Sequence, residues 1–414
     1  MNIWLINHYA VPPKYFPLAR QTYFAKYLMQ RGHQVTIFAA STVHNSDKNL
    51  ITNGVRYRKE VVDGVSYVYI KCRGYKGNGL SRVYNMMEFA WKLSGVCKKF
   101  SKPDAIVATS MPPMSCAAGI RIARHYRCVG VAEIADLWPE SIVAYGVAGK
   151  NNPGVLLLRR LEKWIYKKSD AVVFTMEGAY DYIIDQGWEK EIPSSKVYFI
   201  NNGVDLKEFD YNKEHFQVED ADLNDHETFK IVYAGSIRKA NNLGLLLDVA
   251  KVVDNPRVRF LIWGNGDELP ALRQRLKDEN INNVLFKGRV DKKYVPFITS
   301  HANLTILNYE MHDIWKYGGS QNKLFEYFAG GTPVLTNLVM GRDLIDRYQC
   351  GFHIDYSDIN QAAKRISEIA ATNRDDYDRL CQNARHAAED YDFPKLTQKL
   401  IDLIEVQMKK RRED

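Results

Sequence analysis

Two glycines, a lysine and a glutamate stand close together in the stretch YGGSQNKLFEYFAGGTPVLTN, residues 317–337. A helix that begins just after the glycines places Lys323 and Glu326 on one face, one turn apart. Gly318 and Gly319 would let a ligand approach the bare amides at the positive end of that helix, which is a suitable place for an anion. A diphosphate would fit there, because Lys323 adds a full charge and Glu326 can accept hydrogen bonds from a ribose diol.

The same stretch is equally compatible with an ordinary amphipathic helix. The predicted helix covers residues 320–329, with Ser320 as its N-cap and Tyr327 on the outward face beside the charged pair. A Lys/Glu pair at that spacing adds only about 0.2–0.5 kcal/mol to a surface helix. This stretch alone does not separate the two interpretations.

Glycine-rich turns follow three other predicted strands. They are VYAGSIRK (232–239) with Arg238 and Lys239, IWGNGDEL (262–269) with Gly264 and Gly266, and FKGRV (286–290) with Gly288, Arg289 and Val290. Each turn alone is more simply a tight connection, but four of them at four strand ends favour one nucleotide-sized crevice. The first strand is not followed by GxGxxG, which argues against a nicotinamide or flavin site, and the chain has no Walker lysine motif.

Parallel strands are needed to hold these turns side by side, and short apolar strands alternate with helical segments along the whole chain. The predicted strands are residues 2–7, 34–39, 66–70, 104–108, 128–134, 170–175 and 197–200, then 229–235, 258–264, 283–288, 304–307 and 332–337. The segment 210–228 is polar and strand-free, so a domain boundary lies in or just before it. The expected fold class is therefore α/β, with two doubly wound domains facing across a cleft.

Composition agrees with a globular protein of two domains, since the 414 residues are 46% hydrophobic and 26% charged. The six cysteines form no CxxC pair, so we expect neither a zinc site nor a disulfide framework, and a reducing cytosol fits best. The first strand has no basic leader before it, and no apolar run reaches the roughly 18 residues of a membrane span. We therefore expect neither secretion nor insertion into a membrane.

The two halves of the chain differ in charge. Residues 1–200 carry 27 Lys and Arg against 15 Asp and Glu, whereas the remaining 214 carry 30 against 34. A basic half indicates a polyanionic partner, which is a nucleic acid, an anionic lipid surface or a phosphorylated acceptor. The runs at 98–102 and 159–168 are each more simply solvated helix faces, but together they favour a membrane surface. The apolar residues near the second run form either an interfacial helix or part of the core, and they are Leu156, Leu157, Leu158, Leu161, Trp164 and Ile165.

Seven motifs, in this order, resemble the retaining glycosyltransferases of family 4, which have the GT-B fold. They are RGHQVTIFAA (31–40), IADLWPES (134–141), INNGVD (200–205), VYAGSIRK, IWGNGDEL, FKGRV and NKLFEYFAGGTPVL (322–335). DLWPES and NKLFEYFAGG further resemble bacterial transferases that build lipid-linked O-antigen or capsule intermediates. The resemblance covers essentially the whole chain. It implies an acceptor-binding Rossmann-like domain over 1–205 and a donor-binding one over 206–391, with a helix at 392–414 crossing back to the first.

The resemblance also implies roles for single residues. Arg238, Lys239 and Lys323 would meet the donor diphosphate together with Gly319 and Ser320, Glu326 would hold the ribose, and Gly264, Gly266, Arg289 and Val290 would contact the base. Arg20 and His8 would lie on the acceptor side. Asp136 would orient the acceptor hydroxyl or stabilise the anomeric carbon, although a carboxylate that caps a helix or a turn is a nearly equal alternative.

The sequence departs from the family pattern at three positions. Gly318 stands where many members have a glutamate that grips the donor sugar, eight residues before Glu326. Ala135 replaces a histidine before Asp136, and Asn241 replaces a lysine after Arg238. The residues that hold the donor sugar are therefore left open.

The expected activity is retaining transfer of a sugar, such as an N-acetylated hexose or deoxyhexose, from a UDP-linked donor to a lipid-linked saccharide acceptor. Cations would stabilise the departing diphosphate, so no metal or cofactor is required. We expect a cytoplasmic protein, peripheral at the inner face of the cell membrane, that binds an anionic membrane surface and no nucleic acid. Two alternatives stay open: a nucleotide-sugar 2-epimerase or phosphorylase of the same architecture, and a non-catalytic binding subunit.

Overall fold

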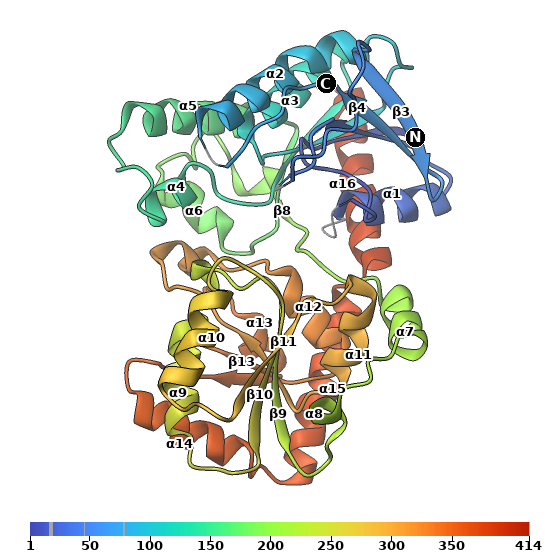
Figure 1. The fold of residues 1–414 in the computed structure, drawn as a ribbon. Coiled ribbons are helices and arrows are strands. Elements are labelled where there is room, and N and C mark those ends of the chain that lie inside the picture. The colour runs from blue at the N-terminus through green and yellow to red at the C-terminus, as the bar shows by residue number, and fades with distance from the viewer. Residues whose placement is uncertain (16–19, 45, 78, 414) are drawn as a thin grey trace. The chain divides into compact units, whose positions relative to one another are not determined.

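The computed structural model describes residues 1–15, 20–44, 46–77 and 79–413, which form two compact units (Figure 1). The first unit comprises Met1–Asn201 and Phe393–Asp414, of which residue 414 lies outside the described part, and the second comprises Asn202–Asp392. The sequence predicted the change of domain slightly later, after residue 205. The unit begins earlier because the Asn202 side chain donates to the Ser320 carbonyl at 2.8 Å and Val204 forms a parallel bridge with Asp392.

The first unit is built on an eight-stranded sheet with the order β3-β4-β2-β1-β5-β6-β7-β8. Neighbouring strands are parallel except for β3, which pairs antiparallel with β4. The strands are β1 (Asn2–Ile6), β2 (Gln34–Ala40), β3 (Tyr57–Val62), β4 (Val65–Ile70), β5 (Ala105–Thr109), β6 (Val129–Ile134), β7 (Ala171–Phe174) and β8 (Val197–Phe199). Every residue of β5, β6 and β7 is buried, as expected for central strands covered by helices on both faces.

Helices cover both faces of this sheet (Figure 1). They are α1 (Arg20–Gln30), α2 (Leu80–Cys97), α3 (Pro113–Tyr126), α4 (Glu140–Ala144), α5 (Pro153–Lys168), α6 (Ala179–Asp185), the short η1 (Ser194–Lys196) and α16 (Phe393–Glu413). The C-terminal α16 belongs to the first unit, where it packs on α1 and β6. The Phe393 ring stacks on Tyr23 with centroids 4.6 Å apart, and the Gln407 amide donates to the Tyr198 hydroxyl at 3.0 Å.

The second unit is built on a six-stranded parallel sheet with the order β11-β10-β9-β12-β13-β14. The strands are β9 (Phe229–Ala234), β10 (Val258–Trp263), β11 (Val284–Gly288), β12 (Leu304–Leu307), β13 (Val334–Thr336) and β14 (Gly351–His353). Alternate residues of β9 serve two cores, since Ile231 and Tyr233 pack against α9 and α14, whereas Val232 packs with residues of α8 and α11.

The remaining helices all lie in this unit and follow the alternation predicted from the sequence. They are α7 (Leu206–His215), α8 (Ala221–Asn224), η2 (Lys239–Asn241), α9 (Leu243–Val252), α10 (Leu269–Asp278), η3 (Lys292–Tyr294), α11 (Val295–Ser300), η4 (Asp313–Tyr317), α12 (Asn322–Ala329), α13 (Leu344–Tyr348), α14 (Ile359–Ile369) and α15 (Arg374–Asp390). The doubly wound arrangement brings the carboxyl ends of β11, β10, β9 and β12 to one edge of the sheet.

Candidate functional site

The glycine-rich turns of the second unit meet at neighbouring strand ends. Gly264 follows β10 with φ of 152°, and a Cβ there would lie 1.8 Å from the Gly235 carbonyl oxygen. A Cβ at Gly266 would lie 1.9 Å from the Ile237 carbonyl oxygen. The Gly264 amide donates to the Gly288 carbonyl at 2.8 Å. These glycines therefore let the turns after β9, β10 and β11 pack directly on one another.

Lys323 lies on the first turn of α12, and aromatic side chains from two strand ends hold its ammonium. Its Nζ donates to the Tyr233 hydroxyl at 2.7 Å and lies 4.3 Å from the centre of that ring. The Tyr309 ring, just after β12, is centred 5.3 Å from Nζ. Burial lowers the pKa of Lys323 to about 7. A bound anion would favour the charged form of this lysine, so the position suits a phosphate.

Asn241 and Gly235 complete the surroundings of Lys323. When the buried Asn241 amide is oriented so that its nitrogen donates to Ser236, its oxygen accepts from Lys323 Nζ at 3.2 Å. A Cβ at Gly235 would lie 2.5 Å from Lys323 Cε, so the glycine gives the lysine its space. The sequence identified Asn241 only as a departure from the family pattern. In the structure it contacts the proposed diphosphate-binding lysine.

The amino end of α12 differs from the predicted helix. The helix begins at Asn322 with Gln321 as its N-cap, because Ser320 is engaged elsewhere: its hydroxyl accepts from the Asn202 amide at 3.3 Å. Tyr327, predicted on the outward face, is fully buried, and its hydroxyl accepts from the Ala234 amide at 3.4 Å. Tyr327 therefore packs α12 against the end of β9, and the outward face is left to Lys323 and Glu326.

Glu326 forms an ion pair with Lys292 of η3, and its side chain is 17% exposed. The sequence did not indicate this lysine, since the segment VDKKYV resembles an ordinary solvated turn. A carboxylate held by one ammonium still has lone pairs free for a diol, so the pair is compatible with ribose binding. Lys292 would then fix the orientation of the carboxylate.

The other predicted donor residues lie on the surface of the same unit. Arg238, Lys239 and Arg289 are exposed; Arg238 lies in the turn after β9, Lys239 begins η2, and Arg289 follows β11 directly. Val290 is half-buried and packs against the cluster that contains Trp263. Gly319 is half-buried in the turn before α12. The exposed cations are thus available to a ligand at the strand ends.

In the first unit, Asp136 is exposed two residues after β6. Arg20 and His8, predicted on the acceptor side, lie inside this unit. Arg20 donates to Glu133 at 2.9 Å and to the carbonyls of Ile200 and Asn201 at 2.7 and 2.6 Å. These bonds fix the segment after β8, where the chain leaves the first unit.

His8 is completely buried between the rings of Tyr9 and Phe89, with centroids 4.5 and 5.1 Å away. Burial lowers the pKa of His8 to about 3, so the ring is neutral. This position is inaccessible to an acceptor, and the expectation for His8 is corrected accordingly.

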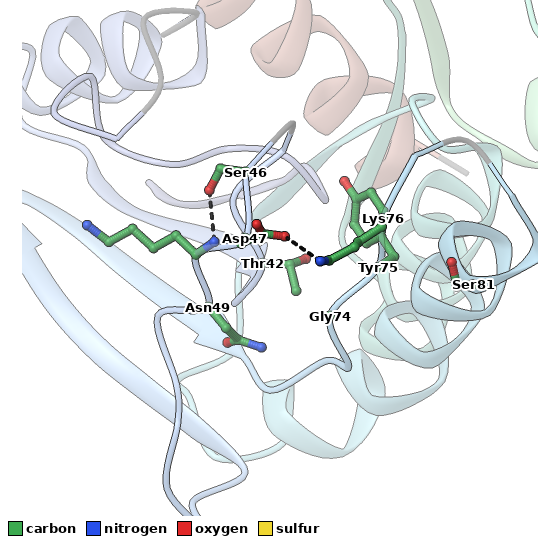
Figure 2. A pocket seen from close by; sticks show the side chains of 9 residues that line it. Thr42, Ser46, Asp47, Asn49, Gly74, Tyr75, Lys76 and Ser81 are labelled. Atoms are coloured by element: carbon green, nitrogen blue, oxygen red, sulfur yellow. Dashed lines mark hydrogen bonds and ion pairs between the residues drawn. The ribbon is translucent and has the colours of Figure 1, made fainter.

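A cavity of about 490 Å³ opens in the first unit between the segment after β2 and the segment after β4 (Figure 2). Its lining consists of Thr42, Ser46, Asp47, Lys48, Asn49, Gly74, Tyr75, Lys76 and Ser81. Lys76 and Asp47 form an exposed ion pair at 3.9 Å across it (Figure 2). Hydroxyl, amide and charged groups beside a tyrosine ring suit a polyhydroxylated ligand.

The described residues, 1–15, 20–44, 46–77 and 79–413, provide neither a metal-binding cluster nor a membrane-spanning helix. No group of three or more His, Cys, Asp or Glu side chains there is arranged to hold a metal ion. None of the helices in that part of the chain is both long and apolar enough to cross a bilayer.

Two protein-family models match separate parts of this chain. Residues 21–208 match the model described as Glycosyltransferase Family 4, and residues 228–372 match the model described as Glycosyl transferases group 1. The chain is 22% identical over 303 residues to the probable glycosyltransferase WbjE of Pseudomonas aeruginosa. The aligned region covers 70% of this chain and 71% of that protein.

Solved structures share the fold at lower identity. The sucrose-phosphate synthase of Thermosynechococcus elongatus superposes with a TM-score of 0.70 at 18% identity, covering 97% of this chain and 98% of that one. Alr3699/HepE of Anabaena, solved in complex with UDP, has a TM-score of 0.68 at 13% identity over 98% of this chain and 100% of its own. The predicted α/β class with two doubly wound units is confirmed. The chain belongs to the glycosyltransferases of family 4 and has the GT-B fold.

Proposed function

We propose that this glycosyltransferase moves a sugar, with retention of configuration, from a UDP-sugar to a lipid-linked saccharide acceptor in surface polysaccharide biosynthesis. The observation that carries the proposal is the half-buried Lys323, whose ammonium is held by Tyr233 beside the glycine turns, with Glu326 one turn away. HepE was solved with UDP and with UDP-glucose, which supports the same class of donor here.

The second unit would hold the donor. The diphosphate would lie between Lys323 and the exposed Arg238 and Lys239, with the ribose on Glu326 and the base along the turns that contain Gly266 and Arg289. Bond cleavage develops negative charge on the β-phosphate, and fixed cations stabilise that charge more than they stabilise the bound donor. This leaving-group stabilisation is the main catalytic contribution that we assign to the protein, and it needs no metal.

The first unit would hold the acceptor. The polar cavity beside Tyr75 offers hydroxyl and amide groups to a saccharide, and Asp136 is an exposed carboxylate at the end of a central strand. We assign to Asp136 either orientation of the acceptor hydroxyl or stabilisation of positive charge at the anomeric carbon. Retention would follow from attack on the face of the leaving group, with the departing phosphate accepting the proton of the hydroxyl.

The test is the release of nucleoside diphosphate, measured for UDP-, GDP- and dTDP-sugars with and without lipid-linked saccharides. The proposal requires release of UDP that depends on the acceptor, and a product with the anomeric configuration of the donor by NMR. Consumption of donor without acceptor would indicate an epimerase or hydrolase instead. Binding of UDP-sugars without turnover for any acceptor would indicate a non-catalytic subunit.

A further inference from the structure

Helix α2 presents a row of large apolar side chains to solvent. Its exposed apolar residues are Leu80 (87% exposed), Val83 (44%), Tyr84 (52%), Met87 (53%) and Trp91 (79%). Residues three, four, seven and eleven positions apart share one face of an α-helix. We call this row the α2 stripe. Exposing an indole and a leucine to water on one face has an unfavourable free energy, so a partner that covers the α2 stripe would be favoured.

The α2 stripe is additional to the surface that folds the helix. The opposite face of α2 is already buried against the unit, mainly against α3, through Asn85, Met86, Phe89, Leu93, Val96 and Cys97. Helix α2 therefore has two apolar faces, and only one of them is used by the fold. By contrast, α5, which the sequence left open as an interfacial helix or part of the core, buries Ile165 and exposes mainly Leu156 and Leu157.

Cations border the α2 stripe at both ends. The guanidinium of Arg73 lies 5.3 Å from the centre of the Tyr84 ring, and the Lys76 side chain is 88% exposed. Lys98 and Lys99 are exposed immediately after the last turn of the helix. The one acidic residue in α2, Glu88, is neutralised by Lys92 at 2.6 Å.

The charge of the whole first unit has the same sign. Its sequence contains 33 Lys and Arg against 19 Asp and Glu, whereas the second unit contains 24 against 30. An apolar row with an exposed tryptophan, set among lysines and arginines, matches the boundary between lipid headgroups and acyl chains. A second copy of this basic unit would have to approach against like charge, which disfavours self-association through this face.

We propose that the α2 stripe is the surface by which this protein docks on anionic lipid, with Leu80, Met87 and Trp91 entering the headgroup boundary. The inference deepens the proposed function, because it names the face that would bring the enzyme to a lipid-linked acceptor. Helix α2 would lie flat on the bilayer, and its flanking cations would contact lipid phosphates. The apolar part of the binding would resist salt, while the electrostatic part would weaken as salt rises.

The test measures binding to phosphatidylcholine vesicles with and without about one third phosphatidylglycerol. The wild type should bind the anionic vesicles. The double variant Met87→Ser/Trp91→Ser should partition at least about tenfold more weakly. Val339→Ser is the matched control, since Val339 is 71% exposed in the second unit, and it should bind like the wild type. The difference in fluorescence between the wild type and Trp91→Phe should shift to the blue on anionic vesicles.

UDP binding by the same variants separates this inference from the proposed function. Weak vesicle binding with normal UDP affinity supports the α2 stripe independently of turnover. Equal vesicle binding by the wild type and the double variant would refute the stripe as the docking surface. A concentration-dependent dimer that the double variant abolishes, without vesicle binding by the wild type, would also overturn the proposal and assign this face to a second copy.

Discussion

Replacing Lys323 by methionine tests the donor site directly, because methionine keeps a long unbranched side chain and removes only the charge. The ammonium contacts the Tyr233 hydroxyl and lies beside Tyr309, and burial lowers its pKa to about 7. If this charge meets the diphosphate in the transition state, its loss should cost about 2–4 kcal/mol, which is roughly 30- to 800-fold in kcat/KM.

The lowered pKa of Lys323 leads to a second prediction, which concerns the uptake of protons when UDP binds. With a pKa lowered to about 7, the amine of the free protein is partly deprotonated near neutral pH, and a bound diphosphate raises the pKa, so UDP binding near pH 7 should take up protons. Affinity should be greatest below pH 7 and should fall as pH rises through 7, by up to about tenfold per pH unit. Calorimetry in buffers of different ionisation enthalpy measures the uptake.

Lys323 should affect folding stability in the opposite direction: UDP affinity falls as pH rises, whereas the free energy of unfolding increases. A lysine with a lowered pKa destabilises the folded protein below pH 7, where the buried amine must carry its charge, and the cost disappears as pH rises from 7 toward the unfolded value of about 10.5. Lys323→Met should therefore remove this component of the pH dependence. Lys277→Ala, an exposed position on α10, is the control. Equal proton uptake by Lys323→Met and wild type, with unchanged turnover, would refute the assignment.

Three further predictions concern the ribose, the turns and the last helix. Glu326→Gln should abolish the preference for UDP over 2′-deoxy-UDP and weaken UDP binding about tenfold, as measured by calorimetry. Gly264→Ala should lower stability by on the order of 3–5 kcal/mol in thermal unfolding, because its Cβ would lie 1.8 Å from the Gly235 oxygen, whereas Gly244→Ala, whose nearest neighbour is at 3.8 Å, should be tolerated. Deleting residues 393–414 should expose apolar surface of the first unit to proteolysis while the second unit still binds UDP; a soluble truncated protein with normal transfer would contradict this.

The buried parallel strands were predictable because their apolar runs leave few alternatives. The two strands absent from the prediction lacked that signal. Strand β3 has the polar sequence YRKEVV and lies at the sheet edge with every residue partly or fully exposed, and β14 has only three residues. An edge strand takes its stability from one neighbour, so its sequence need not be apolar on both faces.

Candidate site residues were predictable from sequence where their type and spacing indicate a role. They were not predictable where the role depends on contacts with residues far away in the sequence. The glycine turns were singled out from sequence because several of them follow successive strands, and Lys323 because it shares a helix face with Glu326, although each signal alone also fits an ordinary turn or helix. Lys292 and Tyr233 were missed, because a lysine in a turn and a tyrosine in a strand gain their meaning only from contacts across the fold. The same reason explains His8, whose position after the first strand resembled an accessible site although its ring is in the core.

The backbone conformation at Gly318 bears on sugar specificity, because many family members have at this position a glutamate that holds the donor sugar. Its φ of 95° lies in a region that side chains disfavour, so the glutamate found here in many family members would strain the turn between η4 and α12. At the next residue, a Cβ on Gly319 would lie 2.5 Å from Met340 Sδ, so the Met340 side chain would have to shift. The backbone at Gly318 therefore favours glycine, and the absence of the glutamate is consistent with the local structure. Contacts to the donor sugar must come from other positions in this chain, so sugar specificity does not transfer from relatives together with the fold.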